Sequence, residues 1–280
     1  MLACSREAGQ PSPTPAVSSS ASPTAVDTTS REKLLSRQEL QDILTGFGGL
    51  DGVELKMTID DSDRQSVVKA LDMDPLEGQL RQVIFFDTND LALNRAGVVL
   101  RARRIQGEDG DTVIKLRPVS PSQVSPKLRS VEAFKVELDV MPERYVCSGS
   151  FEREDIDDKD LKAVLAKTKP IQDLFTPEQR AFYSEHAPKG VSMDSLRVLG
   201  PINTLRLKFS PSGLNRKLVA ELWTYPDGSR VLELSTTCKP EETFAVAEET
   251  MTYLSSKGVK PGTAQQTKTR TALEYFTKVP

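Results

Sequence analysis

The sequence is poor in the residues on which several common kinds of active site depend. Its 280 residues include one histidine, His186, and three cysteines. A single histidine gives little support to a Ser-His-Asp triad or to a metal site built on histidine. Cys147 and Cys238 lie far apart without a C-x-x-C motif, which argues against zinc and thioredoxin-like chemistry. Whether they pair in an exported protein or stay buried thiols in a cytosolic one is open.

Long apolar runs and a strong charge imbalance are also missing. No stretch approaches the roughly 18 apolar residues that a membrane-spanning helix needs. Thirty-seven Lys and Arg stand against 40 Asp and Glu, a formal net charge of −3. This balance gives no electrostatic reason to expect a nucleic-acid partner, although a local basic cavity is still allowed.

The first thirty residues differ in composition from the rest. Twenty of them are Pro, Ser, Thr or Ala, so residues 1–30 are expected to be a disordered tether. Leu2-Ala3-Cys4 resembles the end of a bacterial lipoprotein signal, in which the cysteine is lipidated. That interpretation gives an extracytoplasmic protein held to a membrane through Cys4. The alternative is a chance tripeptide at the start of the tail of a cytoplasmic protein.

From residue 31 to residue 280 we expect one domain in which strands are joined mostly by short turns. A helix is indicated by apolar residues at helical spacing in Leu34, Leu35, Leu40, Ile43 and Leu44. Period-two alternation predicts strands at about 52–60, 82–88, 97–105, 112–118, 131–140, 203–210, 216–226 and 229–237. Helical patterns occupy 63–72, 156–168, 176–187, 240–257 and 264–277. The acidic stretch 152–160 is interpreted as a solvated turn. The pattern predicts an α+β protein, an eight-stranded antiparallel β-barrel decorated with α-helices.

Each predicted strand carries an apolar face and an ionic face. Side chains at positions i and i+2 point the same way, and many such pairs here are fully charged. The pairs are Glu54 and Lys56, Arg101 and Arg103, Lys115 and Arg117, Glu137 and Asp139, and Arg206 and Lys208, with Glu221 and Glu233 on the last two strands.

An ordinary half-buried sheet with its charged face in water explains part of this pattern. Like charges directly opposed on neighbouring strands are unfavourable, however, and Arg101, Arg103, Lys115 and Arg117 would lie close together. A polyanion held among these cations, and a hard divalent cation among the carboxylates, would explain the clustering. We therefore expect the ionic face to line a hydrophilic tunnel. Phe85, Phe209 and Trp223 are interpreted as core residues rather than nucleobase platforms.

The residues at this point resemble the CYTH superfamily, also called triphosphate tunnel metalloenzymes. The resemblance extends from about Gly52 to Phe276. Its motifs are specific to the family over residues 83–139, and the matches outside that block agree with it. It rests on Phe86-Asp87-Thr88-Asn89-Asp90-Leu91 followed by Leu100-Arg101-Ala102-Arg103, on Lys115-Leu116-Arg117, Glu137-Leu138-Asp139 and Glu54-Leu55-Lys56, and on Lys268-Thr269-Arg270 with Ala272-Leu273.

The resemblance implies a role for each charged group. The phosphate ligands would be Lys56, Arg101, Arg103, Lys115, Arg117, Arg206, Lys208 and, at one mouth of the tunnel, Lys268. The ligands of Mg²⁺ or Mn²⁺ would be Glu54, Glu137, Asp139 and Glu233. Lys56 and Glu54 would be the catalytic pair. The sequence departs from the family at Gly52 and Ser235, where acidic residues are expected, so fewer carboxylates are available to bind the metal ion.

Two functions from different classes follow. The first, slightly favoured, is metal-dependent hydrolysis of inorganic triphosphate or of a nucleoside triphosphate. The second is a catalytically weak or inactive module that binds polyphosphate or an organophosphate and is tethered to a membrane. Cyclisation of ATP, which some members of the family perform, ranks last. The outer apolar face of residues 82–88 and 97–104 would be covered by the protein's own helices or by a second subunit in a homodimer.

Overall fold

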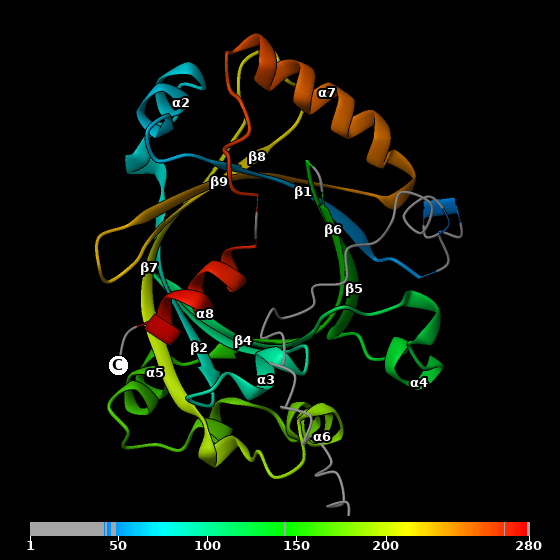
Figure 1. Cartoon of the computed structure of the whole chain (residues 1–280), viewed down its shortest axis with the longest axis vertical. Helices are drawn as coiled ribbons and strands as arrows, with labels where there is room; N and C mark the ends of the chain where they lie inside the picture. The colour runs from blue at the N-terminus through cyan, green and yellow to red at the C-terminus, as the bar shows by residue number, and fades with distance from the viewer. Residues whose placement is uncertain (1–41, 43, 46–48, 143, 266, 279–280) are drawn as a thin grey trace, which may run out of the picture.

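A closed β-barrel is the centre of the computed structural model, which describes residues 42, 44, 45, 49–142, 144–265 and 267–278 (Figure 1). The strands are β1 (Gly52–Ile59), β2 (Gln79–Asp87), β3 (Val98–Ile105), β4 (Glu108–Leu116), β5 (Phe134–Met141), β6 (Arg144–Ile156), β7 (Arg197–Phe209), β8 (Leu218–Thr224) and β9 (Arg230–Cys238). The helices are α2 (Arg64–Ala70), α3 (Ala92–Arg95), α4 (Pro126–Arg129), α5 (Asp158–Leu165), α6 (Pro177–His186), α7 (Thr243–Ser256) and α8 (Lys268–Lys278).

The strand order around the barrel is β1-β5-β6-β4-β3-β2-β7-β8-β9, and β9 returns to β1. All neighbouring strands run antiparallel except β1 and β5, which pair in parallel with Glu54 opposite Asp139. The expected barrel decorated with helices is confirmed. The expected count of eight strands and the purely antiparallel arrangement are corrected: within the described ranges, nine strands form a mixed barrel.

The strand missing from the sequence-based prediction is β6, which includes most of the acidic stretch interpreted as a turn. Small residues, Ser148, Gly149 and Ser150, interrupt its hydrophobic pattern, and its acidic end is exposed. Gly149 is required there because a Cβ atom would come within 2.7 Å of the Phe134 ring. The sequence pattern did not predict this strand because its central residues are small, which allows close packing against a neighbour, and do not alternate between apolar and polar.

Alternation along each strand separates the two faces of the barrel wall. In β1, Val53, Leu55, Met57 and Ile59 are buried while the residues between them are half-buried. The buried residues point outward to the helices, and Glu54 and Lys56 point inward to a cavity. The apolar surface of this barrel is therefore on its outside, as the sequence predicts.

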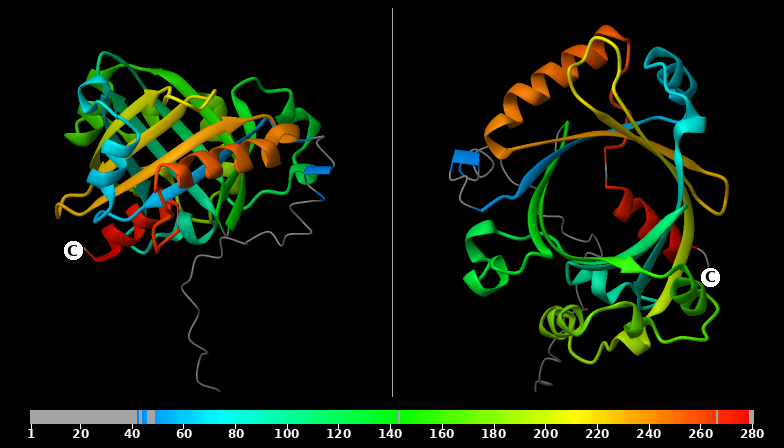
Figure 2. Two further views of the ribbon diagram at one scale, coloured as in Figure 1. Left: turned by 90° about the horizontal axis from the view of Figure 1, so that it is seen from above. Right: turned by 180° about the vertical axis from the view of Figure 1, so that it is seen from behind.

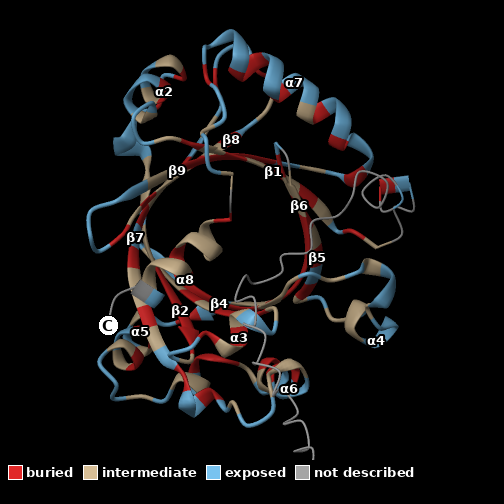
Figure 3. Cartoon of the chain, in the orientation of Figure 1, coloured by how far each residue is buried: buried red, intermediate tan, exposed pale blue. Residues whose placement is uncertain are grey.

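Helices cover that outer surface, and their buried sides face the barrel (Figure 3). On one side, Leu161 of α5 and Phe182 of α6 belong to the same apolar cluster as Leu100 and Ile114 of the wall. On the other side, Leu254 of α7 and Val67 of α2 cover the outer face of β1, β8 and β9. The wall is thus fixed from outside, which leaves its inner face to charged side chains.

The helix α8 lies across one end of the barrel, within the ring of strands (Figures 1 and 2). Its Ala272 and Leu273 pack into an inner apolar cluster with Phe85 and Trp223. Phe85 and Trp223 are therefore core residues, as expected, and Phe209 packs against the outer cluster of α2 and α7. One end of the barrel is apolar and filled, so the polar cavity occupies the remainder.

Some expectations fall outside the part of the chain that the structure describes. These are the tether over residues 1–30, Cys4, and most of the helix expected over Leu34–Leu44. Asp42 and Leu44 of that helix are described and helical, as is Thr45. Cys147 and Cys238 are free thiols. Among the described residues, no helix combines the length and apolar character needed to cross a membrane.

Candidate functional site

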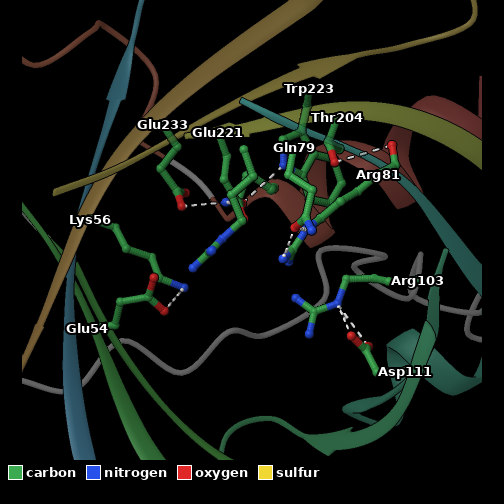
Figure 4. Close-up of polar contacts among 12 residues, drawn as sticks. Glu54, Lys56, Gln79, Arg81, Arg103, Asp111, Thr204, Glu221, Trp223 and Glu233 are labelled. Atoms are coloured by element: carbon green, nitrogen blue, oxygen red, sulfur yellow. Dashed lines mark hydrogen bonds and ion pairs between the residues drawn. The ribbon is translucent and has the colours of Figure 1, made fainter. Parts of the chain in front are cut away.

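Inside the barrel lies a polar cavity of about 260 Å³. Among the described residues, eight cationic side chains line it, namely Lys56, Arg81, Arg101, Arg103, Lys115, Arg117, Arg206 and Lys268. Five carboxylates share the lining, namely Glu54, Glu137, Glu152, Glu221 and Glu233. Figure 4 shows Lys56 and Arg103 extending into the same space from different strands. The excess of cations on an enclosed surface favours an anionic ligand.

Most of the sequence-predicted site residues meet in this cavity. Seven of the eight expected phosphate ligands line it, and so do Glu54, Glu137 and Glu233 of the expected metal ligands. The exceptions are Lys208 and Asp139. For the residues that line the cavity, the role of phosphate or metal ligand stays a prediction.

Lys208 is exposed and does not line the cavity. It follows Arg206 by two positions on β7, but the neighbouring strand β2 begins at Gln79, opposite Arg206. Lys208 therefore lies past the end of β2, and its cross-strand partner is Val219 of β8 on the other side. Strand alternation gives the direction of a side chain but not the point at which the wall ends.

Asp139 is 1% exposed and lies beneath the lining rather than in it. Its Oδ1 is 2.9 Å from Lys56 Nζ, and its Oδ2 accepts a hydrogen bond of 2.7 Å from Arg117 Nη2. Both carboxylate oxygens are thus already engaged by cations. Its position makes Asp139 a support for Lys56 and Arg117.

In one part of the site, which we call the paired region, every cation contacts at least one carboxylate of the protein itself. The paired region consists of Glu54, Lys56, Asp139, Arg206, Glu221, Glu233 and Lys268. Lys56 Nζ lies 3.0 Å from Glu54 Oε2 as well as 2.9 Å from Asp139 Oδ1. Lys268 Nζ lies 2.7 Å from Glu233 Oε1 and also contacts Glu221. Each lysine ammonium therefore bridges two carboxylates.

The pKa shifts in the paired region result from these ion pairs and from burial. Burial alone would lower the pKa of Lys56, but Asp139 and Glu54 raise it above its usual value. Burial opposes ionisation of Glu221, yet Lys268 and Arg206 bring the pKa of Glu221 below its ordinary range. Burial raises the pKa of Glu233, and the nearby Lys268 opposes that shift.

A second part of the site, the unpaired region, consists of Arg101, Lys115 and the free edge of Arg117. Arg101 Nε and Arg117 Nε and Nη1 are buried without a hydrogen-bond acceptor among the described residues. The nearest carboxylate oxygen to Lys115 Nζ is Glu137 Oε2, at 4.0 Å. Buried donors without acceptors cost about 1–3 kcal/mol each. These groups are arranged for an acceptor that the protein itself does not provide.

The pKa values of the unpaired region are lowered instead of raised. Burial and the neighbouring Arg117 lower the pKa of Lys115 to about 8. Burial and Arg103 lower the pKa of Arg101 to about 10. In both residues, burial and a neighbouring cation outweigh the nearby carboxylates, which act to raise the pKa.

Sequence reasoning missed three charged residues of the site. Arg81 lines the cavity but precedes the predicted start of its strand, because β2 begins three residues earlier than the pattern indicates. Glu152 also lines it and belongs to the strand that was not predicted. Asp111 lies opposite Arg103 and accepts a hydrogen bond of 2.8 Å from Arg103 Nε. Extending the period-two pattern outward from Val83 would have identified Arg81.

The carboxylates do not fit a divalent cation as they are arranged. Mg²⁺ requires near-octahedral oxygen ligation at about 2.0–2.1 Å. No group of three His, Cys, Asp or Glu side chains within the described ranges is placed to hold a metal ion. The carboxylates of the paired region contact lysine and arginine instead. Binding of Mg²⁺ or Mn²⁺ stays a prediction.

Comparison with known proteins identifies the fold. No protein-family model matches the sequence, and no curated protein matches it significantly. Among solved structures, a candidate adenylate cyclase from Bacillus halodurans matches with a TM-score of 0.55 at 14% identity, over 80% of this chain and 98% of that one. The candidate adenylyl cyclase HpAC1 from Hippeastrum, described as having a dominant triphosphatase activity, matches with a TM-score of 0.57 at 19% identity, over 79% of this chain and 95% of that one. The chain therefore has the tunnel-barrel fold of these structures.

Proposed function

We propose that the barrel is a binding site for tripolyphosphate or for the triphosphate end of a small molecule. The proposal is carried by the unpaired region, where Arg101 Nε and Arg117 Nε and Nη1 are buried without an acceptor among the described residues. Lys115 Nζ lies in the same cavity, 4.0 Å from the oxygen of Glu137. A phosphate chain offers oxygen acceptors on every phosphorus and negative charge along its length. Arginine binds such oxygens through paired N–H groups, and lysine binds them as a point charge.

The dimensions of the cavity favour a compact ligand. Its volume of about 260 Å³ lies just below the range of roughly 300–1,000 Å³ typical of small-molecule sites. Among the described residues, Ala272 and Leu273 of α8 fill the apolar end of the barrel, which is the place where a nucleobase would have to fit. We therefore favour inorganic tripolyphosphate over a whole nucleotide.

Membership of the CYTH superfamily is part of this proposal. The motifs around Arg101 and Lys115 resemble that family, and the barrel they build is shared with two proteins whose names refer to cyclase and triphosphatase activities. The cations of those motifs meet in one cavity of this chain.

Hydrolysis of the bound triphosphate is the second candidate function. It is favoured by the fold shared with HpAC1, which is described as a triphosphatase. Among the described residues, no serine, cysteine or histidine lines the cavity, so the chemistry would depend on positioning and charge neutralisation. Cyclisation of ATP ranks below hydrolysis because the filled apolar end offers no base site.

Calorimetric titration with tripolyphosphate, pyrophosphate and orthophosphate tests the binding proposal. We expect affinity to decrease in that order, because each phosphate lost removes oxygen acceptors. Lys208→Ala is the matched control, since it removes a cation from outside the cavity. Equal, weak affinity for all three anions would refute the proposal.

Hydrolysis is tested separately by incubating the protein with tripolyphosphate or ATP and either Mg²⁺ or Mn²⁺. Release of phosphate that is lost in Lys56→Ala would support the enzyme, and cyclic AMP among the products of ATP would support the cyclase. Tight binding without turnover under either metal would identify a binding module.

We further propose that Cys4 anchors the protein to a membrane through lipid. The support is the Leu2-Ala3-Cys4 sequence followed directly by the Pro-, Ser-, Thr- and Ala-rich stretch. One acyl chain binds membranes only marginally, so we expect more than one chain. Intact mass spectrometry of protein from its native host would show the added lipid, and an unmodified Cys4 would refute the anchor.

A further inference from the structure

Two carboxylates stand directly opposite each other inside the barrel. Glu221 on β8 pairs in register with Glu233 on β9, and both side chains line the cavity. Like charges opposed on neighbouring strands are destabilising, more so where water is excluded. Glu233 is 2% exposed. This strand pair therefore creates a place that requires a cation.

Lys268 supplies that cation. Its Nζ lies 2.7 Å from Glu233 Oε1 and contacts Glu221 as well, so one ammonium group bridges both carboxylates. Glu221 also lies 3.3 Å from Arg206 Nε and accepts a hydrogen bond of 3.4 Å from Trp223 Nε1. Both oxygens of Glu221 thus contact groups of the protein itself, and Glu233 Oε1 forms an ion pair with Lys268 but accepts no hydrogen bond from the described residues.

The fold fixes Lys268 in this position. Lys268 is the first residue of α8, and one turn later Ala272 and Leu273 are buried in the apolar end of the barrel. The Trp223 ring lies 5.4 Å from Lys268 Nζ, within the range of a cation–π contact. The packed helix and the aromatic ring fix the position of the ammonium group, and the Lys268 side chain is mostly buried.

A divalent metal bound to Glu221 and Glu233 would compete for the same oxygens and would place its charge beside the ammonium. The two cations therefore exclude each other. We propose that Lys268 is the resident cation of the barrel, which takes the place of a divalent metal between Glu221 and Glu233 and lets the cavity bind polyphosphate without metal. The last clause rests on the proposed function.

Titration of the whole protein with Mn²⁺ alone tests the place of Lys268. We expect wild type to bind Mn²⁺ weakly and Lys268→Met to gain at least about tenfold in affinity at one ion per chain. The midpoint of thermal unfolding of Lys268→Met should rise on addition of Mn²⁺, while that of wild type should stay unchanged. Lys268→Arg, which keeps the charge, should behave like wild type. One Mn²⁺ bound equally tightly by wild type and Lys268→Met would overturn the proposal.

A double variant protects the test against failure of Lys268→Met to fold. In Lys268→Met/Glu221→Gln the opposed carboxylates no longer repel, so we expect a folded protein that has lost the gain in Mn²⁺ affinity. If the double variant binds Mn²⁺ as tightly as Lys268→Met does, or if neither variant exceeds wild type, Glu221 and Glu233 do not form the cation site.

Tripolyphosphate titration in EDTA, repeated in Mg²⁺, tests the metal-free uptake. We expect binding to persist in EDTA with no increase in affinity when Mg²⁺ is added. Binding that requires Mg²⁺ would overturn this part of the inference while leaving the proposed function intact. Absence of binding in both buffers would refute the proposed function and metal-free uptake together, and the Mn²⁺ titration would still decide the place of Lys268.

Discussion

The paired and unpaired regions of the cavity solve the same electrostatic problem in opposite ways. In the paired region, Lys56 and Lys268 each bridge two carboxylates. In the unpaired region, Arg101 and Lys115 are as enclosed as those lysines, but no carboxylate bridges them. Burial acts on all four cations, so the difference lies in their partners.

The contrast separates structural charges from charges kept for a ligand. A buried ion pair that is complete contributes to one defined geometry, and removing one member leaves the other unpaired. A buried cation without a partner weakens the free protein and strengthens its complex with an anion. Substitutions in the paired region should therefore mainly lower the free energy of unfolding. Substitutions in the unpaired region should mainly lower the affinity for the anion.

The largest effect is expected in the paired region. Lys56→Met removes the ammonium group between Glu54 and Asp139, and breaking a buried pair in this way costs about 3–5 kcal/mol. Denaturant unfolding at pH 7 measures the loss, with the exposed Lys208→Met as the matched control. A Lys56→Met protein as stable as wild type would show that these contacts do not hold the site together.

Arg101→Met should weaken binding with little loss of stability. Truncating one partner of a buried, hydrogen-bonded charge pair costs about 2 kcal/mol or more, which is roughly a 30-fold loss of tripolyphosphate affinity. The free energy of unfolding without ligand should be unchanged or higher, since an unpaired cation has been removed. Calorimetry and denaturant unfolding of the same preparation give both quantities. If Arg101→Met lowered the free energy of unfolding by as much as it lowered the free energy of tripolyphosphate binding, the two regions would not differ in the way proposed.

Lys115 should give binding and stability opposite dependences on pH. Its pKa is about 8 in the folded protein and about 10.4 when unfolded, so between these values the unfolded chain holds more protons. Stability without ligand therefore gains a contribution that increases with pH from about 8 to 10. Tripolyphosphate affinity should fall by up to about tenfold per pH unit above 8, because the bound anion requires the ammonium form.

Lys115→Met isolates these contributions, since other groups also titrate at high pH. The difference between wild type and the variant should contain the rise in stability and the fall in affinity. Identical pH profiles for the two proteins, in either quantity, would show that Lys115 does not carry the uncompensated charge.

The smallest effect is expected at Lys208. Lys208→Ala removes an exposed cation past the end of β2, and surface changes of this kind alter free energies by no more than about 0.5 kcal/mol. Tripolyphosphate affinity should stay within about twofold of wild type in calorimetry. A loss as large as that of Arg101→Met would place Lys208 in the binding site.

The sequence was sufficient to predict the face on which the charges lie. Strand alternation has a strict period of two, so Glu54 and Lys56 had to share a face, and the apolar neighbours had to share the other. Whether the charged face pointed into the barrel depended on closure of the sheet. The clustering of Arg101 with Lys115 favoured an enclosed anion and hence closure, and the structure confirms the closed barrel. The cations are not directly opposed, however, because Val113 lies opposite Arg101 and Val99 lies opposite Lys115.

Features set by tertiary packing could not be predicted in the same way. The strand β6 was hidden by its small residues: Gly149 leaves room for the Phe134 ring, and Ser150 lies opposite Lys115 of the interior. Lys208 was misplaced because the end of a barrel wall is set by the neighbouring strand. The bridging of Glu221 and Glu233 by Lys268 depends on the docking of α8, which joins residues far apart in the sequence.

The location of a bound anion tests the central claim most directly. A crystal structure of the full chain with tripolyphosphate, grown without divalent metal, would show it. We predict phosphate oxygens within hydrogen-bonding distance of Arg101, Lys115 and Arg117, with Lys268 still bridging Glu221 and Glu233. Tripolyphosphate bound only on the outer surface, with the unpaired cations of the cavity untouched, would contradict the account.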